Sequence, residues 1–341
     1  MRRCAFNTGS DFHLLDHIGP FAHAHKMPLF IEEEKNFTLF KHYYPMAESI
    51  HFPEMASDLS FFAKNFDELY ECKFWLPHLK KLFADLYQKE MRLIFCAHGQ
   101  SDKGFGAPLL HPYASQDCCM IYGKLFKEML QELKISANCK ETGNYRLSHY
   151  LKYQEFYDSI AKKEILSKFP NPQFTLLYAP TWKDADGATS FFQNISSLCE
   201  TLPSSINLIV KVHPLLEQRD PAQYYHIAHI IEQMPNRLLL ETFLPIYPLL
   251  ACADAYLGDY SSVGYDFLYF QKPMFFLLNE SLPKGKIHHC GLVLKSIDEL
   301  FENLAENPYR DQQEALYRKA FCVSRREGGE QTKHLDRSSY L

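Results

Sequence analysis

The chain has 341 residues, of which 46% are hydrophobic and 23% are charged, and its formal net charge is -5. This length suits two domains with separate cores, and the acidic balance argues against broad nucleic-acid binding, which needs a basic surface. No apolar run is long enough for a signal peptide or a membrane-spanning helix. Ten cysteines without a Cys-x-x-Cys pair indicate buried, reduced thiols. We therefore expect a soluble cytoplasmic protein.

In the first half of the chain, short apolar runs alternate with helical patterns, which is typical of a parallel sheet with crossover helices. A helix is predicted over 76–89, where apolar residues recur at helical spacing. A charged helical segment over 148–169 ends at two prolines, and we place the domain boundary there. The strands predicted in this half are 4–7, 28–32, 49–52, 91–97 and 118–122.

The second half repeats this alternation more regularly and ends in a charged tail, 324–341, that we expect to be loose or draped over a neighbour. The pattern predicts an α/β fold of two Rossmann-like domains facing a cleft, one over 1–169 and one over 170–341. The predicted strands are 174–178, 207–212, 237–240, 255–257 and 274–278. The predicted helices are 190–202, 222–233, 248–252, 261–270 and 297–305.

Ligands in such sheets bind beyond the carboxyl ends of the strands, and one predicted strand ends in an unusual polar segment. Asp259-Tyr260-Ser261-Ser262 follows the strand 255–257 and opens the helix 261–270. The N–H groups of a first helical turn, together with serine hydroxyls and the helix dipole, can hold phosphate oxygens. Asp and Ser are also favoured helix caps, so this segment alone fits a plain cap equally well.

Two further strands end in histidine, one in each predicted domain. His213 is followed by Pro214, which disfavours helix at the preceding residue and restricts the orientation of the imidazole. His98 is followed by Gly99, which allows a ligand to approach the backbone closely. An imidazole titrates near neutral pH and suits proton transfer or a contact with phosphate. The other histidines lack metal-site spacing, and we predict no functional metal.

These segments, in this order, resemble the motifs of the CDP-glycerol glycerophosphotransferase family, the teichoic-acid primases and polymerases of bacterial cell walls. Residues 179–184, Ala-Pro-Thr-Trp-Lys-Asp, are similar to the family's Ala-Pro-Thr-Trp-Arg-Asp. Residues 259–266 match every fixed position of its Asp-Tyr-Ser-Ser-x-x-x-Asp motif. His213-Pro214 corresponds to its strand-end His-Pro, and 142–146 resemble its Gly-x-Pro-Arg turn, with Tyr145 in place of proline.

The resemblance spans roughly residues 90–280 and is weakest around His98. The family typically has Trp-His-Gly-Thr-Pro-Leu-Lys, whereas residues 97–103 read Ala-His-Gly-Gln-Ser-Asp-Lys. His98, Gly99 and Lys103 keep the spacing of the motif. Because this segment belongs to the acceptor side in the family, the departure leaves the acceptor open.

The resemblance implies a glycosyltransferase-B architecture with an acceptor-side first domain and a donor-binding second domain. A CDP-linked polyol would give its polyol phosphate to an acceptor hydroxyl and release CMP. His98 would act as the base, and His213 would stabilise the negative charge that grows on the leaving CMP. The expected donor and phosphate contacts are Thr181, Lys211, Asp259, Tyr260, Ser261, Ser262 and Arg146. The expected supporting residues are Gly99, Lys103, Pro180, Pro214 and Asp266, the last orienting the Ser-Ser turn.

The implied partners are a nucleotide-linked donor and a lipid-linked acceptor at the inner membrane face, with no cofactor required and the oligomeric state open. Two alternatives remain open. Sugar-nucleotide glycosyltransferases and epimerases that use UDP sugars share this architecture. The altered segment around His98 also fits a repurposed member that binds a nucleotide-linked ligand without turnover, or that scaffolds an envelope assembly.

Overall fold

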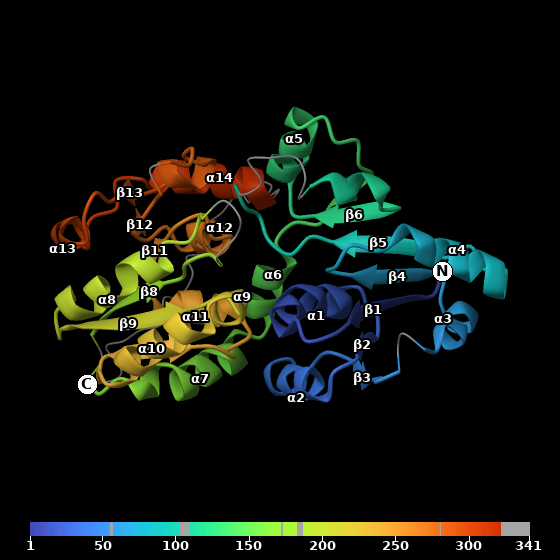
Figure 1. Cartoon of the computed structure of the whole chain (residues 1–341), viewed down its shortest axis with the longest axis horizontal. Helices are drawn as coiled ribbons and strands as arrows, with labels where there is room; N and C mark the ends of the chain where they lie inside the picture. Colours follow the sequence, from blue (N-terminus) through green and yellow to red (C-terminus); the bar gives the residue numbers. More distant parts are fainter. Residues whose placement is uncertain (55–56, 103–109, 172, 183–186, 280, 322–341) are drawn as a thin grey trace. The chain divides into compact units, whose positions relative to one another are not determined.

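The computed structural model describes residues 1–341 except 55–56, 103–109, 172, 183–186, 280 and 322–341 (Figure 1). The chain divides into two compact units. The described residues of the first unit lie within 1–100, 110–152 and 319–321. Those of the second unit lie within 101–102 and 153–318. Both units are α/β.

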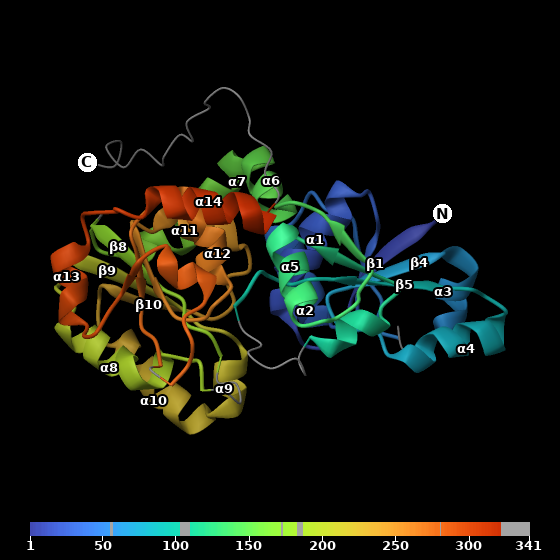
Figure 2. The same ribbon diagram turned by 90° about the horizontal axis from the view of Figure 1, so that it is seen from above.

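The first unit is built on a seven-stranded parallel sheet in the order β3-β2-β1-β4-β5-β6-β7. Its strands are β1 (Arg3–Asn7), β2 (Leu29–Ile31), β3 (Ser49–His51), β4 (Glu68–Glu71), β5 (Arg92–Cys96), β6 (Cys118–Ile121) and β7 (Cys139–Glu141). Its helices are α1 (Leu15–Ala24), α2 (Glu34–Tyr43), α3 (Leu59–Asn65), α4 (Pro77–Tyr87), α5 (Lys124–Glu132) and α6 (Tyr145–Lys152). Helices α1 and α6 pack side by side (Figure 2).

The second unit is built on a six-stranded parallel sheet in the order β10-β9-β8-β11-β12-β13. Its strands are β8 (Phe174–Tyr178), β9 (Ile206–Lys211), β10 (Arg237–Leu240), β11 (Ala255–Gly258), β12 (Met274–Phe276) and β13 (Leu292–Val293). Its helices are α7 (Gln154–Glu164), α8 (Phe191–Thr201), α9 (Leu215–Arg219), α10 (Pro221–Glu232), α11 (Ile246–Cys252), α12 (Val263–Phe267), α13 (Asp298–Asn303) and α14 (Arg310–Phe321), whose last three residues are counted with the first unit.

Apolar side chains on both faces of the second sheet explain why it is buried and parallel. Strand β9 reads Ile-Asn-Leu-Ile-Val-Lys and is buried except at its last residue, as expected of a strand covered by helices on both sides. One core cluster joins β8 and β9 to α8 and α10, and these two helices pack against each other (Figure 1). Strand order reverses between β8 and β11, and ligands commonly bind at such a switch point.

Most predicted strands and helices lie where the sequence placed them, and β8 and β10 match to the residue. Strand β4 was missed because it begins and ends with glutamate, although both carboxylates are buried. The expected helix over 148–169 is two helices, α6 and α7, and α7 packs on α11 of the second unit. The units therefore divide at 152/153 rather than at 169/170. The tail 324–341 lies outside the described residues.

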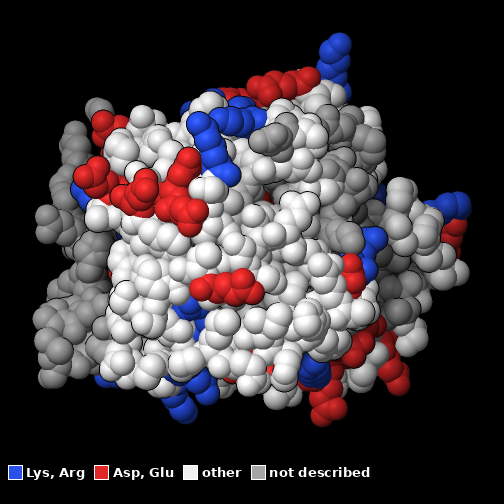
Figure 3. All heavy atoms as spheres, turned by 60° about the vertical axis from the view of Figure 1, so that its left-hand side comes forward, with Lys and Arg blue, Asp and Glu red and all other residues white. Residues whose placement is uncertain are grey.

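Charged side chains of both signs occur on one face of the molecule. On the face shown in Figure 3, the described Lys and Arg residues lie among Asp and Glu residues, around a broad uncharged area. Within the described ranges, no helix has both the length and the apolar character needed to cross a membrane.

Candidate functional site

The carboxylate of Asp259 organises the carboxyl edge of the second sheet. This residue follows β11 and is fully buried. Its Oδ1 accepts hydrogen bonds from the N–H groups of Thr181 (2.8 Å) and Ser261 (3.1 Å). Its Oδ2 accepts from the N–H (2.8 Å) and hydroxyl (2.9 Å) of Ser190. Asp259 thus joins the segments that follow β8 and β11, and the structure gives it a positioning role in place of the predicted phosphate contact.

The Ser261-Ser262 turn lies immediately before α12, as the sequence predicted. Ser261 is buried, and its hydroxyl oxygen accepts from the N–H of Val263 at 3.4 Å. Ser262 is the residue that precedes the helix, and its side chain makes no capping hydrogen bond. The plain-cap interpretation, which assigns the cap to Asp259 or Ser261, agrees with the hydrogen bonds from the N–H groups of Ser261 and Val263, and the Ser262 hydroxyl takes no part in capping. Helix α12 is only five residues long and continues as the 3₁₀ turn η5 (Leu268–Phe270).

Two other residues of the motif point into the protein. The Tyr260 hydroxyl donates to the carbonyl oxygen of Pro283 at 3.1 Å, so this side chain secures the 282–283 segment. Asp266 accepts from the Tyr247 hydroxyl on α11 at 2.9 Å. Both motif side chains are buried. The Tyr260 hydroxyl therefore supports the segment that follows β12, and Asp266 joins α12 to α11, while its expected role in orienting the Ser-Ser turn stays a prediction.

His288 is a supporting residue that sequence reasoning did not assign. Its Nε2 donates to the backbone carbonyl of Asp259 at 3.1 Å, and its Nδ1 accepts from the N–H of Gly285 at 2.8 Å. Burial lowers the pKa of His288, which favours the neutral ring that both hydrogen bonds require. A histidine next to His289 carried no signal that distinguished this role from a surface position.

His213 lies at the carboxyl end of β9, the strand next to β8, and is half-buried. Its Nδ1 accepts from the N–H of Leu215 at 3.2 Å, which leaves the proton of the neutral ring on Nε2. The sequence suggested that Pro214 would prevent a helix after His213. Helix α9 nevertheless begins directly after Pro214, a position where proline costs no backbone hydrogen bond. Lys211, at the last position of β9, is half-buried.

An aromatic ring and a guanidinium group lie next to His213. The rings of Trp182 and His213 are 6.3 Å apart, and the Arg219 guanidinium lies 5.6 Å from the centre of the Trp182 ring. Trp182 belongs to the motif that begins at Ala179, whereas Arg219 lies on α9, a helix that the sequence did not predict. Together these residues offer hydrogen-bond donors, a cation and a flat apolar surface.

The segment after His98 departs from the family motif for a visible reason. Ser101 and Asp102 pack with the second unit. Asp102 accepts from the Tyr265 hydroxyl (2.8 Å) and from the N–H of Ile287 (3.0 Å). A side chain at Gly285 would begin 2.4 Å from Asp102, so glycine is required there. These contacts need a carboxylate, which the leucine of the family motif could not supply.

His98 itself belongs to the first unit, where its side chain is exposed at the carboxyl end of β5. Its Nδ1 donates to the Cys72 carbonyl at 3.0 Å, so Nε2 of the neutral ring is the nitrogen that can accept a proton. Gly99 has a φ of 122°, a conformation that favours glycine. Lys103 lies outside the described residues.

A buried network lies beside His98. The His17 ring is 6.3 Å from that of His98, and its Nδ1 is hydrogen-bonded to the Tyr122 hydroxyl at 2.7 Å. Burial, followed by the nearby charge of Arg146, lowers the pKa of His17. The ring is therefore neutral at physiological pH and adds no positive charge next to His98.

Arg146 anchors the far side of this network. Its guanidinium forms a buried ion pair with Asp16 at 3.0 Å, and Asp16 also accepts from the Tyr44 hydroxyl. The guanidinium also lies 5.5 Å from the centre of the Tyr122 ring. Since its charge is paired inside the first unit, the structure gives Arg146 a positioning role rather than the predicted contact with the donor phosphates.

These two clusters can be compared with known proteins. Residues 150–323 match the family described as CDP-glycerol:poly(glycerophosphate) glycerophosphotransferase. The chain belongs to this family. The matched range contains Thr181, His213 and the Ser261-Ser262 turn, whereas His98 and Arg146 lie before it. A search of curated proteins finds no match.

Solved structures resemble this glycerophosphotransferase-family chain over most of its length. The wall teichoic acid polymerase TagF has a TM-score of 0.61 at 13% identity, covering 94% of this chain and 85% of its own. The UDP-GlcNAc 2-epimerase of Neisseria meningitidis, bound to UDP-GlcNAc, has a TM-score of 0.53 at 13% identity, covering 94% and 99%. HepE of Anabaena, in complex with UDP-glucose, has a TM-score of 0.55 at 12% identity, covering 94% and 96%. These likenesses confirm the predicted fold class.

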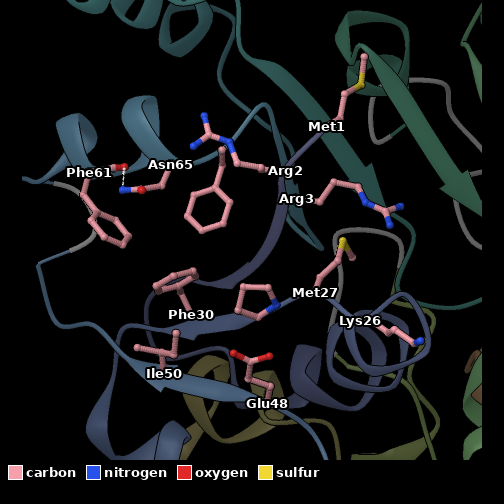
Figure 4. Close-up of a pocket in the computed structure, with 12 residues that line it drawn as sticks. Met1, Arg2, Arg3, Lys26, Met27, Phe30, Glu48, Ile50, Phe61 and Asn65 are labelled. Atoms are coloured by element: carbon pink, nitrogen blue, oxygen red, sulfur yellow. Dashed lines mark hydrogen bonds between the residues drawn. The ribbon is translucent and has the colours of Figure 1, made fainter.

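One pocket lies away from all of these residues. It has a volume of about 550 Å³ and is lined by the start of β1, including Arg2 and Arg3, and by Lys26, Phe30 and Phe61 (Figure 4). These residues cluster at the amino ends of the strands of the first sheet, whereas His98 follows the carboxyl end of β5. The pocket therefore does not belong to the candidate site. No group of His, Cys, Asp and Glu within the described ranges could hold a metal ion.

Proposed function

We propose that this chain transfers a polyol phosphate, with glycerol as the polyol, from a CDP-linked donor to an acceptor hydroxyl and releases CMP. The observation that carries the proposal is the Ser261-Ser262 turn, which Asp259 holds at the switch point of the second sheet. The turn lies inside the range that matches the glycerophosphotransferase family.

The diphosphate of the donor is assigned to the second unit. The Ser262 hydroxyl can donate to its oxygens, whereas the N–H groups of Val263 and Gly264 at the start of α12 already donate to Ser261. His213 can donate through Nε2, since its Nδ1 already accepts from the backbone. Thr181 and Lys211 follow or end the adjacent strands, and both remain proposed donor contacts. Such fixed donors stabilise the negative charge that grows on the leaving CMP.

The acceptor hydroxyl is assigned to His98. Its oxygen attacks the phosphorus of the polyol phosphate while the anhydride bond to CMP breaks and the bonding electron pair stays on CMP. The hydroxyl proton passes to Nε2 of His98, the ring nitrogen opposite the one held by Cys72. The His17 ring beside it is neutral, so it adds no positive charge that would oppose protonation of His98. The acceptor itself, which we propose to be a lipid-linked polymer end, is not specified by these residues.

A UDP-sugar is the second candidate donor. The chain shares its fold with an epimerase bound to UDP-GlcNAc and with HepE bound to UDP-glucose. The residues around Ser262 and His213 contact phosphates in either case, so they do not choose between cytosine and uracil. A member that binds its nucleotide without turnover is the third candidate, because Asp102 replaces the family's leucine at the position directly before Lys103.

Nucleotide titrations with the purified chain test the donor. We expect CMP and CDP-glycerol to raise the melting temperature, and UDP and UDP-glucose to leave it unchanged. Incubation with CDP-glycerol should release CMP in the presence of a glycerophosphate primer. Stabilisation by uridine nucleotides alone would replace the proposed donor by a UDP-sugar. Stabilisation by CMP with no CMP release from CDP-glycerol would favour the non-catalytic member.

A matched pair of variants tests the site. His213→Ala should abolish the shift caused by CDP-glycerol, whereas His226→Ala, on the exposed side of α10 in the same unit, should retain it. Equal shifts in both variants would remove His213 from the donor site.

A further inference from the structure

Two cysteines lie side by side on the last two strands of the first sheet. Cys119 of β6 and Cys139 of β7 are register partners. Neighbouring strands are about 4.8 Å apart, which falls within the roughly 4.4–6.8 Å Cα separation that a disulfide spans. Both side chains belong to one apolar cluster with Phe126 and Leu130 of α5, and Figure 1 shows this helix beside β6. The two thiols therefore share one face of the sheet.

The thiol of Cys119 is held on this face of the sheet. It donates to the Tyr113 carbonyl at 3.5 Å, and Tyr113 belongs to the same apolar cluster as both cysteines. The preceding residue, Cys118, pairs in register with Ile94 of β5 and points to the other face of the sheet. The shared face is thus a feature of Cys119 and Cys139 and not of Cys118.

The pair has one reactive and one protected member. Cys139 is half-buried on the edge strand, whereas Cys119 is fully buried. The neighbouring Cys119 side chain, followed by the charge of Lys127, lowers the pKa of Cys139. By contrast, burial raises the pKa of the following described cysteines: Cys4, Cys72, Cys96, Cys118, Cys199 and Cys290. Because the thiolate is the nucleophile, oxidation should begin at Cys139.

We propose that Cys139 and Cys119 form a reversible disulfide when the protein meets a hydroperoxide. The Cys139 thiolate attacks the peroxide, the O–O bond breaks, and Cys139 becomes a sulfenic acid while hydroxide leaves. The sulfur of Cys119 then attacks that of Cys139, the S–O bond breaks, and the departing hydroxide takes the Cys119 proton as water. Two thiols are oxidised and one peroxide is reduced to two waters. A cellular dithiol or glutathione restores both thiols.

The position of the pair gives this bond a structural consequence. Strand β7 leads into a turn in which the N–H groups of Thr142 and Gly143 donate to Ile121 (2.8 Å) and Tyr122 (3.0 Å). β7 is an edge strand with a single neighbour. A covalent link between β6 and β7 would fix this edge and reduce the conformational freedom of the unfolded chain, so the melting temperature of the oxidised protein should rise.

Oxidation of the full chain followed by peptide mapping tests the proposal. The protein is treated with hydrogen peroxide, blocked with N-ethylmaleimide, digested without reductant and analysed by mass spectrometry. We expect one cross-linked peptide pair that contains Cys119 and Cys139 and is lost after dithiothreitol. Cys139→Ser should abolish it, and Cys118→Ala should retain it. A different cross-link, or Cys139 oxidised to sulfinic acid while Cys119 reacts with the maleimide, would overturn the proposal.

Two further measurements keep the test independent of folding defects in the variants. The wild-type protein equilibrated in glutathione redox buffers should show the cross-link rise and fall reversibly with the buffer ratio. Its melting temperature should rise in parallel, and Cys118→Ala should behave in the same way. An irreversible cross-link, or an oxidised protein that melts at a lower temperature than the reduced one, would contradict the proposed site.

Discussion

The two units arrive at their polar clusters in different ways. In the second unit, the turn at the site lies within a short motif, because Asp259 binds the N–H group of Ser261 only two residues away, although Ser190 and His288 bind Asp259 from outside that motif. In the first unit, His98 depends on residues from distant parts of the chain, with His17 and the Asp16–Arg146 pair beside it. A turn that is held by its own neighbouring residues can thus be recognised from a short sequence motif. A network whose residues come from distant segments leaves no local pattern in the sequence.

His98→Ala should give the largest effect on turnover. It tests whether the exposed imidazole is the general base of the first unit. Loss of a general base typically lowers turnover by about 10²–10⁴-fold, while the exposed side chain contributes little to stability. CMP release and melting temperature should be measured together. His78→Ala, on the exposed face of α4, is the matched control. Wild-type turnover in His98→Ala would end the assignment of a base to this unit.

Arg146→Met probes the buried network behind that histidine. Removing one partner of a buried ion pair typically costs about 3–5 kcal/mol, because the remaining carboxylate of Asp16 stays buried without its counter-charge. Urea denaturation should report this loss. The double variant Arg146→Met with Asp16→Leu should recover part of it. A single variant as stable as the wild type would show that the pair does not hold the network.

Asp259→Ala asks the corresponding question of the second unit. Its carboxylate satisfies the N–H groups of Thr181, Ser190 and Ser261, and a buried donor left without a partner costs about 1–3 kcal/mol. We expect a loss of about 3 kcal/mol in unfolding free energy, and loss of the melting shift caused by CMP. Asp220→Ala, at the start of α10, is the control. Retained CMP binding in a folded Asp259→Ala protein would contradict the positioning role.

The smallest effect concerns the pH dependence of the first unit. Burial lowers the pKa of His149 to about 3 and also lowers that of His17. At mildly acidic pH these two histidines therefore bind protons in the unfolded chain but stay neutral in the folded chain. Stability should be complete above the unfolded histidine pKa of about 6.5 and should fall below it, by at most about 1.4 kcal/mol per pH unit for each group. Denaturation at pH 7 and pH 5.5 measures the slope, and His149→Gln should reduce it. An unchanged slope would mean that His149 is not buried in its neutral form.

The sequence predicted the second unit well because its elements are regular and its site is local. Strand β8, the turn at Ser261 and the strand-end position of His213 were all visible as short patterns. Strand β4 was hidden by the charges of Glu68 and Glu71, whose partners Arg92 and Thr8 lie elsewhere in the chain. The helix after Pro214 was hidden because proline interrupts a helix in its interior and begins one at its first turn.

The residues that sequence reasoning missed share one property. Arg219, His288 and Asp102 contribute through contacts with segments that are far away in sequence or that follow an unpredicted helix. Arg146 and Asp259 were recognised by type, but their roles were set by burial, because each charge already has a partner or donors within its own unit. A single sequence records residue types, whereas these roles depend on tertiary neighbours.

The central claim is that a nucleotide diphosphate binds where Asp259 shapes the Ser261-Ser262 turn. A crystal structure of the chain soaked with CDP-glycerol tests it most directly. We predict diphosphate density within hydrogen-bond distance of the Ser262 hydroxyl and of His213 Nε2. Density that places the diphosphate elsewhere on the protein, with the Ser262 hydroxyl turned to other protein groups, would contradict the account.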